Sequence, residues 1–281
     1  MKKVLLLGAT GFIGSHFKCT LMKEGFKVFT PRIEIRNHTE VEKAVYETKP
    51  DVIINATGIT GYPNVDWCED HPGETMSVNV GGSINIATVA EEFGTYMVQM
   101  ASGCVYDGGK KGGYTEDDEP NYFGSLYSRS RVYSEKALKE FKNVLQLRVR
   151  IPITGKPHPK NLINKLLKYP KMINIQNSCT IIEDFIPAAI ELMKRKETGI
   201  FNMTNIGAMD HKSIMEMYKE IVDPKFEIKI MGKREQDTLC QRRANCVMNT
   251  DKREKLGVHM PPLEKSLRRM LEKYKAVMVE E

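Results

Sequence analysis

The stretch Lys3-Val4-Leu5-Leu6-Leu7-Gly8-Ala9-Thr10-Gly11-Phe12-Ile13-Gly14 decides the fold of this 281-residue chain. Its first half is a continuous apolar run, which is typical of a parallel strand buried on both faces. Its second half places three glycines at GxxGxxG spacing before a helical pattern, and such glycines let a pyrophosphate approach the backbone. The stretch therefore predicts the first βα unit of a dinucleotide-binding sheet, the alternative being a glycine-rich turn without a ligand. The residues predicted to bind the dinucleotide here are Gly8, Thr10, Gly11, Phe12, Ile13 and Gly14.

The first half of the chain continues this alternation of strand and helix patterns. Short apolar runs predict strands over 27–30, 51–55, 96–100 and 144–150, and helical spacing predicts helices over 39–48, 73–93 and 122–142. Thr39 is the expected N-cap of the first of these helices. Because strands that alternate with helices form parallel sheets, we expect an α/β fold with a Rossmann-type doubly wound parallel sheet over 1–151. Residues 152–281 are expected to form a smaller C-terminal substrate-binding lobe, with a boundary that the chain crosses more than once.

Composition excludes several classes of protein. The net charge of +6 is mild and basic residues alternate with acidic ones, so no nucleic-acid partner is expected. No apolar run approaches the ~20 residues that cross a bilayer, and the N-terminus shows no signal-peptide pattern. We therefore expect no membrane partner and a cytoplasmic location. The six cysteines form no CxxC pair and show no zinc spacing, which predicts neither a metal site nor a disulfide framework.

The residues after the second and third predicted strands bear on the choice of cofactor. An NAD-binding site usually places an acidic residue after the second strand, where it accepts a hydrogen bond from the ribose 2′-OH. Here Arg32 and Arg36 follow instead, and a guanidinium can bind a 2′-phosphate in bidentate fashion. NADP(H) is therefore the preferred cofactor, with NAD(H) as the alternative if these arginines are simply solvated. Small residues follow the third strand and leave room for the dinucleotide, namely Ala56, Thr57 and Gly58.

Tyr127, Arg131 and Ser102 predict a site for ketone reduction. Tyr127 and Arg131 lie four residues apart and share a helical face, while Ser102 follows the fourth strand at the ligand-binding edge. The tyrosine can protonate a ketone oxygen as hydride arrives, the serine can hydrogen-bond that oxygen, and the cation can hold the nicotinamide ribose. This is the YxxxK arrangement of short-chain dehydrogenases with arginine in place of lysine, which keeps the charge but loses the compact ammonium. A fold that binds the cofactor without turning it over is the alternative.

Five further segments are telling, and two of them, NVDWCE and the segment that begins SGC, are far more specific than the glycine loop. They are TGITG at 57–61, NVDWCE at 64–69, SGCVY at 102–106, LRVRIP at 147–152 and NLINK at 161–165. Nearly end to end, the chain resembles the bifunctional UDP-4-keto-6-deoxyglucose 3,5-epimerase/4-reductases, the nucleotide-rhamnose synthase modules. It resembles dTDP-4-dehydrorhamnose reductases more distantly. The resemblance implies an extended short-chain dehydrogenase/reductase that uses NADPH to convert UDP-4-keto-6-deoxyglucose into UDP-L-rhamnose.

The resemblance also implies roles for individual residues. In that family a cysteine two residues after the reductase serine and a lysine in the cap form the epimerase acid/base pair, which here implies Cys104 and Lys165. Without the resemblance, Cys104 would be taken for a small core residue and Lys165 for a solvated lysine. Residues 242–249 resemble a stretch of the reductases that we expect to reach the substrate diphosphate, but the doubled arginine leaves the register open. The residues implied to bind substrate are Thr60, Asn64, Trp67 (for which packing under its loop is the alternative), Asn161, Arg242 and Arg243.

Two other functions stay open at this point. One is a dTDP-4-dehydrorhamnose reductase only, which would have no need of Cys104 and Lys165. The other is a non-catalytic cofactor-binding regulatory subunit, an option that Arg131 keeps open. No residue decides between UDP and dTDP. We further expect a separate 4,6-dehydratase to supply the keto sugar. By analogy with other proteins of this fold, a homodimer is one candidate oligomeric state.

Overall fold

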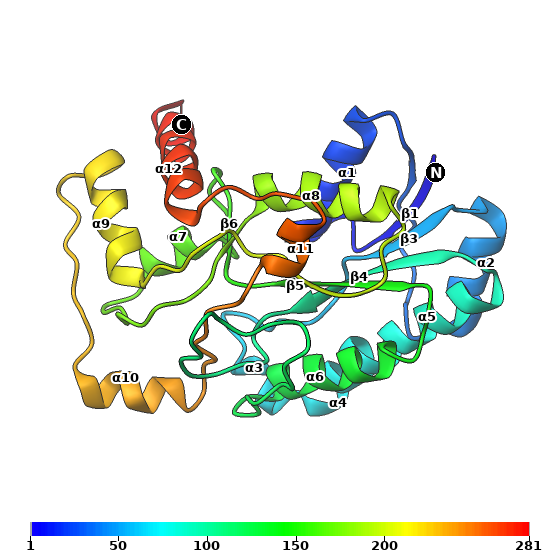
Figure 1. The fold of residues 1–281 in the computed structure, drawn as a ribbon, viewed down its shortest axis with the longest axis horizontal. Helices are drawn as coiled ribbons and strands as arrows, with labels where there is room; N and C mark the ends of the chain where they lie inside the picture. Colours follow the sequence, from blue (N-terminus) through cyan, green and yellow to red (C-terminus); the bar gives the residue numbers. More distant parts are fainter. Residues whose placement is uncertain (1, 281) are drawn as a thin grey trace. The chain divides into compact units, whose positions relative to one another are not determined.

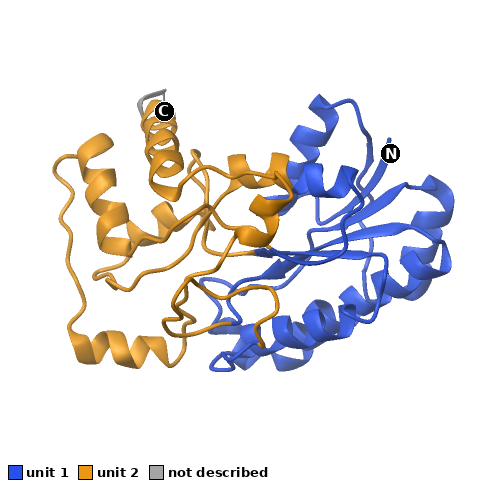
Figure 2. Ribbon diagram, in the orientation of Figure 1, with its two compact units in different colours: residues 1–105, 120–148, 189–201 blue, residues 106–119, 149–188, 202–281 orange. Residues whose placement is uncertain are grey.

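The structure, a computed structural model, describes residues 2–280, and the chain divides into two compact units (Figures 1 and 2). Unit 1 comprises the residues up to 105 together with 120–148 and 189–201. Unit 2 comprises 106–119, 149–188 and the residues from 202 onwards. No helix within the described range has both the length and the apolar character that a membrane span requires.

Unit 1 contains the parallel sheet that the apolar runs predict. The strand order is β2-β1-β3-β4-β5-β8, and the α/β class with a Rossmann-like parallel sheet is confirmed. Figure 1 shows α5 and α6 on one face of the sheet and α1 on the other. The elements are β1 (Lys3–Leu7), α1 (Phe12–Lys23), β2 (Lys27–Phe29), α2 (His38–Thr48), β3 (Val52–Asn55), α3 (Trp67–Asp70), α4 (Pro72–Met76), η1 (Ser77–Gly82), α5 (Ser83–Glu92), β4 (Tyr96–Ser102), α6 (Leu126–Leu138), β5 (Val144–Val149) and β8 (Gly199–Asn202).

The strand register brings the predicted binding segments to one edge of the sheet. Leu7 pairs with Asn55 of β3, and Asn55 pairs in turn with Gln99 of β4. Because these strands are parallel, the residues that follow each of them leave the sheet at its carboxyl edge, where open α/β sheets bind ligands. The amide groups of Asn55 and Gln99 are hydrogen-bonded at 2.8 Å in the buried interior, which ties β3 to β4 just below that edge.

Three local expectations for unit 1 are corrected by the structure. Asn37, not Thr39, caps α2, and its side chain accepts the backbone N–H of Glu40. Helix α6 begins at Leu126 rather than near residue 122, because the Ser125 side chain caps it, and it ends at Leu138. The helical run expected over 73–93 is interrupted by the π-helical segment η1 between α4 and α5, a feature that often marks a functional site.

A buried ion pair fixes helix α6 to the sheet. The Arg148 guanidinium on β5 donates two hydrogen bonds of 2.7 Å to the Glu135 carboxylate on α6, and both side chains are fully enclosed. Removing one partner of such a pair leaves a buried charge uncompensated, at a cost of about 3–5 kcal/mol. The pair therefore holds in place the helix on which the predicted tyrosine lies.

Unit 2 has its own apolar core. Residues from α7, α9 and α12 pack together with the short parallel pair β6 and β7, and fully buried side chains such as Leu166, Ile214 and Leu267 fill the centre. The elements are β6 (Pro152–Ile153), α7 (Leu162–Leu166), β7 (Thr180–Ile181), α8 (Ile182–Lys194), which continues into unit 1, α9 (His211–Ile221), α10 (Lys233–Cys240), α11 (Asp251–Lys255) and α12 (Leu263–Glu280).

Candidate active site

The glycine loop between β1 and α1 leaves the backbone bare where a dinucleotide would bind. A Cβ on Gly14 would lie 2.1 Å from the carbonyl oxygen of Gly8, so no side chain fits between α1 and the end of β1. Gly11 is the N-cap of α1 and supplies no side chain to cap it. The first N–H groups of the helix and its dipole therefore suit the pyrophosphate of a dinucleotide.

Replacing Gly14 by alanine is expected to weaken NADPH binding by at least about tenfold, because α1 must move away from Gly8 and takes the N–H groups of its first turn with it. Gly73→Ala is the matched control, since a Cβ there meets nothing within 4 Å. The dissociation constant is measured by fluorescence titration and the melting temperature is followed in parallel. An unchanged dissociation constant for Gly14→Ala would contradict this assignment of the cofactor loop.

The two arginines after β2 differ in their surroundings. Arg36 donates to both carboxylate oxygens of Glu34, at 2.9 and 2.7 Å, and this hydrogen bonding lowers the pKa of Glu34 to about 2. The pair thus stays ionised at any physiological pH, and Arg36 already has an anionic partner. Arg32 is exposed and follows β2 more closely. Of the two, Arg32 is the better candidate for binding a 2′-phosphate.

Arg131 lies against Gly58 and the ring of Tyr127. A Cβ on Gly58 would sit 2.3 Å from a terminal nitrogen of the Arg131 guanidinium, so the glycine makes room for the cation. The guanidinium carbon lies 5.3 Å from the centroid of the Tyr127 ring. Arg131 is only 7% exposed, and its Nε is a buried atom without a hydrogen-bond partner in the described part of the chain. An orphaned donor at the edge of the sheet fits a site that is completed by a ligand.

Ser102 connects the predicted reduction site with Cys104. The Tyr127 hydroxyl donates to Ser102 Oγ at 3.4 Å, and the backbone N–H of Cys104 donates to the same oxygen at 3.1 Å. Ser102 is buried at the end of β4, whereas Cys104 and Tyr127 are half-buried. The structure thus brings together Ser102, Cys104, Tyr127 and Arg131 at one place in unit 1.

A buried asparagine, Asn79, holds two segments of this site together, and nothing in the sequence predicted this role. Asn79, in the π-helical segment, accepts the backbone N–H of Ile59 at 2.8 Å and donates to the Ile59 carbonyl at 3.0 Å. It also donates to Ser130 Oγ at 3.1 Å, and Ser130 in turn donates to the carbonyl of Tyr127 at 2.7 Å. Asn79 therefore joins the segment after β3 to the helix that carries Tyr127 and Arg131.

Burial distinguishes Cys104 from Cys68 and Cys179, whose thiols are enclosed. Cys68, in the NVDWCE segment, is fully buried, and burial raises the pKa of its thiol. Burial likewise raises the pKa of Cys179 to about 12. Neither thiol can exchange protons with a substrate in solution, whereas Cys104 is half-buried at the edge of the sheet. No cluster of potential metal ligands occurs among the residues that the structure describes.

The predicted substrate loop after β3 packs around Trp67. Thr60, Asn64 and Trp67 are all half-buried in unit 1, and Asn64 Oδ1 accepts the backbone N–H of Asp66 at 2.8 Å. The indole of Trp67 is stacked on His71, with ring centroids 3.7 Å apart and planes 6° from parallel. Contact with a sugar and packing under the loop both stay open for Trp67.

The other predicted site residues lie in unit 2. Asn161 is fully buried, caps α7 and donates to the carbonyls of Thr154 and Lys156 at 2.8 and 2.9 Å. This geometry favours a supporting role for Asn161, because its side chain holds the helix on which Lys165 lies. Lys165 itself is half-buried in the last turn of α7.

The segment that follows Arg242 and Arg243 is held by a buried arginine. Arg150 is 1% exposed and donates to the carbonyl of Ala244 at 2.7 Å and to the side chain of Asn177. Arg243 is half-buried, whereas Arg242 is exposed. The backbone just after the two arginines is therefore held in place, and both Arg242 and Arg243 stay candidates for binding the diphosphate.

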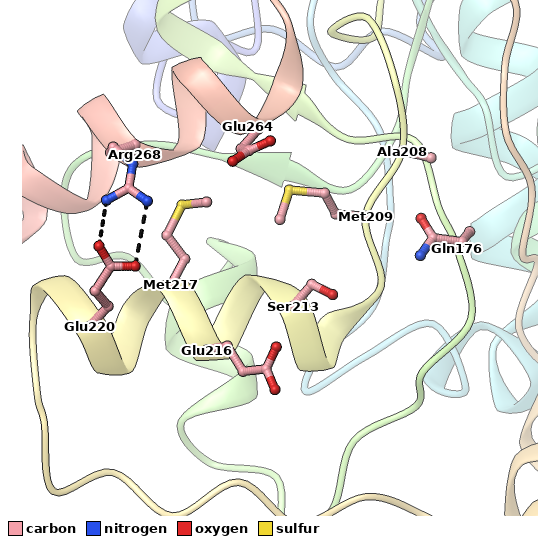
Figure 3. Close-up of a pocket in the computed structure, with 9 residues that line it drawn as sticks. All are labelled: Gln176, Ala208, Met209, Ser213, Glu216, Met217, Glu220, Glu264 and Arg268. Carbon is pink, nitrogen blue, oxygen red and sulfur yellow. Dashed lines mark hydrogen bonds and ion pairs between the residues drawn. The ribbon is translucent and has the colours of Figure 1, made fainter.

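A pocket of about 420 Å³ in unit 2 contains none of the predicted site residues (Figure 3). Met209 and Met217 are among the residues that line it, and Glu220 is paired with Arg268 at 2.7 Å. Glu216 and Glu264 add two further carboxylates. This excess of negative charge does not suit a nucleotide diphosphate, so we assign the pocket no part in the reaction.

A parallel sheet with a glycine-rich first turn and a tyrosine–serine pair at its carboxyl edge defines a protein of the short-chain dehydrogenase/reductase fold. The chain belongs to the RmlD substrate binding domain family, which it matches over residues 1–276.

Three relatives illustrate the range of this family. The trifunctional UDP-glucose 4,6-dehydratase/UDP-4-keto-6-deoxy-D-glucose 3,5-epimerase/UDP-4-keto-L-rhamnose-reductase of Arabidopsis thaliana is 36% identical over 273 residues, 94% of this chain and 41% of the relative. The chain thus spans 35–41% of the length of the trifunctional relatives that it matches. The bifunctional dTDP-4-dehydrorhamnose 3,5-epimerase/dTDP-4-dehydrorhamnose reductase of the same plant is 38% identical over 229 residues, 79% of this chain and 76% of the relative. The crystal structure of a UDP-rhamnose synthase from Acanthamoeba polyphaga mimivirus has 30% identity and a TM-score of 0.91, covering 96% of this chain and 99% of its own.

Proposed function

We propose that the chain converts UDP-4-keto-6-deoxyglucose into UDP-L-rhamnose by epimerising C3 and C5 and reducing C4 with NADPH. One observation carries the proposal: Ser102 Oγ accepts both the Tyr127 hydroxyl, at 3.4 Å, and the backbone N–H of Cys104, at 3.1 Å. A pair that can hold a ketone oxygen therefore lies beside the backbone of the residue whose half-buried thiol is the proposed acid/base group. The name of the UDP-rhamnose synthase relative supports the product. The name of the bifunctional relative, which refers to the dTDP sugar, supports the combination of epimerase and reductase activities.

Epimerisation uses the ketone that the later reduction consumes. C3 and C5 both lie next to the C4 carbonyl, so loss of a proton from either gives an enolate whose charge rests on the ketone oxygen. Hydrogen bonds from Tyr127 and Ser102 stabilise that oxygen. Cys104 and Lys165 are the proposed groups that remove the proton on one face of the sugar and return one on the other. The number of protons on the sugar is unchanged, and only the configuration at each carbon is inverted.

Reduction follows in the same site. Bound NADPH supplies the hydride that C4 accepts. Tyr127 donates its hydroxyl proton to the ketone oxygen, Ser102 keeps that oxygen in place, and a proton from solvent restores the tyrosine. Arg131, held between Gly58 and the Tyr127 ring, binds the nicotinamide ribose. We assign recognition of the 2′-phosphate to Arg32, which makes NADPH the preferred cofactor.

The test is an incubation of the purified chain with UDP-4-keto-6-deoxyglucose and NADPH, with products identified by NMR. The expected result is UDP-L-rhamnose in a one-to-one ratio with oxidised cofactor, with slower turnover when NADH replaces NADPH. A parallel reaction with the dTDP sugar shows which base is preferred. If the chain reduces a sugar that has already been epimerised but does not convert UDP-4-keto-6-deoxyglucose, its function is that of a reductase only. Tight NADPH binding with no turnover of any keto sugar would favour the regulatory subunit.

A further inference from the structure

Glu69, the last residue of the NVDWCE segment, connects the substrate loop to the helix that carries Tyr127. It lies on the single-turn helix α3. One of its carboxylate oxygens accepts the backbone N–H of Leu126, the first residue of α6, and the other accepts the Arg129 guanidinium at 3.1 Å. Arg129 also donates to the carbonyl of Phe123 at 2.9 Å. One carboxylate thus joins α3, the start of α6 and the chain leading into α6.

The start of α6 is a place where a carboxylate is strongly stabilised. The first N–H groups of a helix have no partner within the helix, and its dipole favours negative charge there. Ser125 satisfies the N–H of Ser128 at 3.2 Å, and Glu69 satisfies that of Leu126. A hydrogen bond between an ionised acceptor and a helix N–H is about twice as strong as a neutral one. The contact is therefore more than an incidental surface ion pair, although both side chains of the pair are about one-third exposed.

Helix α3 depends on such contacts because four residues cannot form a stable helix alone. Cys68 anchors one side of the turn in the core, and Glu69 anchors the other side to α6. Trp67 precedes both residues. Its Cβ lies 2.7 Å from the position that a Cβ on Gly61 would take, so the earlier part of the loop packs directly on this turn. Glu69 therefore helps to hold the turn at 67–70 and the part of the loop that packs on it, while Asn79 holds the start of the loop at Ile59.

We propose that Glu69 is a positioning residue that fixes the substrate loop, residues 59–71, against the first turn of α6 so that bound sugar meets Tyr127 in a defined place. The part of this inference that concerns the sugar rests on the proposed function. The part that concerns the loop rests on the contacts of Glu69 alone. Glu69 itself need not touch the substrate, because its carboxylate is already engaged by Leu126 and Arg129.

The loop can be observed without any enzymatic assay because Trp67 is the only tryptophan in the chain. Glu69→Gln keeps the size of the side chain and removes its charge. We expect acrylamide quenching of the Trp67 fluorescence to rise about twofold or more in this variant, since the loss of a charge-assisted hydrogen bond shifts an opening equilibrium about tenfold. Asp70→Asn is the matched control, because Asp70 is the exposed carboxylate next along the same helix. Glu69→Asp, which keeps the charge, is expected to restore part of the protection.

The kinetic measurement separates positioning from a general loss of stability. In Glu69→Gln we expect the KM for the keto sugar to rise about tenfold, with kcat and the KM for NADPH changed by less than about threefold. The melting temperatures of Glu69→Gln and Asp70→Asn are compared alongside. Unchanged Trp67 quenching in Glu69→Gln would overturn the proposal. Increased quenching with an unchanged KM would overturn its connection with the substrate. A wild-type chain that turns over no keto sugar would refute the proposed function, while the quenching result would still decide whether Glu69 holds the loop.

Discussion

Tyr127→Phe is expected to slow the reduction of the keto sugar by about 10²–10⁴-fold, because it removes the proton donor while leaving the aromatic ring in place. The ring still packs beside the Arg131 guanidinium, whose carbon lies 5.3 Å from its centroid, so binding of NADPH should change little. The rate at which the sugar's C3 and C5 hydrogens exchange with solvent should fall by only about tenfold. One hydrogen bond to the enolate oxygen is lost, but Ser102 continues to stabilise that oxygen.

The control for this variant lies on the same helix. Tyr133 is 45% exposed, so Tyr133→Phe should leave both rates within about twofold of the wild type. Reduction is measured as NADPH oxidation with the epimerised keto sugar, and exchange is measured by NMR. Equal losses of reduction in the two tyrosine variants would contradict the role assigned to Tyr127.

Cys104→Ala is expected to show the opposite pattern. Removing one of the two proposed acid/base groups should slow the exchange of the sugar's C3 and C5 hydrogens with solvent by about 10²–10⁴-fold. Reduction of a keto sugar that is already epimerised should stay within about threefold, because Tyr127 and Ser102 keep their 3.4 Å contact and the Cys104 contribution to Ser102 comes from its backbone N–H. Cys19→Ala is the control, since Cys19 is an exposed thiol outside the site. Equal losses of exchange and reduction in Cys104→Ala would mean that the thiol supports the site rather than moves protons.

The sheet and its glycine-rich first turn could be predicted because their signals are local, whereas the binding of a cofactor there stays a prediction. Strands β1 and β3 are continuous apolar runs, and β4 and β5 are mostly apolar. Parallel pairing then aligns Leu7, Asn55 and Gln99. The glycines of the first turn indicated where a side chain would not fit, and the 2.1 Å approach at Gly14 gives the physical reason.

Helix boundaries were less predictable because the apolar pattern extends beyond the helices. The spacing of apolar residues favours a start for α6 near 122, whereas the structure starts it at Leu126, after the Ser125 cap. The serine that ends the ambiguity is visible in the sequence, but a capping residue is recognised only when the chain before it is known to be non-helical. The π-helical turn at 77–82 leaves the apolar pattern almost unchanged and has no comparable signal.

The contacts that support the site could not be predicted because they join residues far apart in sequence. Asn79 and Ile59 are separated by 20 positions, and Glu69 and Arg129 by 60. Neither asparagine nor glutamate in a helical pattern indicates a partner, since the same residues are commonly solvated. The resemblance drew attention to the NVDWCE segment, but only the structure assigns its glutamate to the start of α6.

Hydrogen exchange in D2O shows whether one chain both epimerises and reduces the keto sugar. The purified protein is incubated with UDP-4-keto-6-deoxyglucose in D2O without NADPH and followed by NMR, and NADPH is then added. We predict deuterium at both C3 and C5 before the addition, and UDP-L-rhamnose carrying deuterium at both positions after it. If a protein confirmed to bind NADPH introduces no deuterium at either carbon, the chain does not epimerise this sugar.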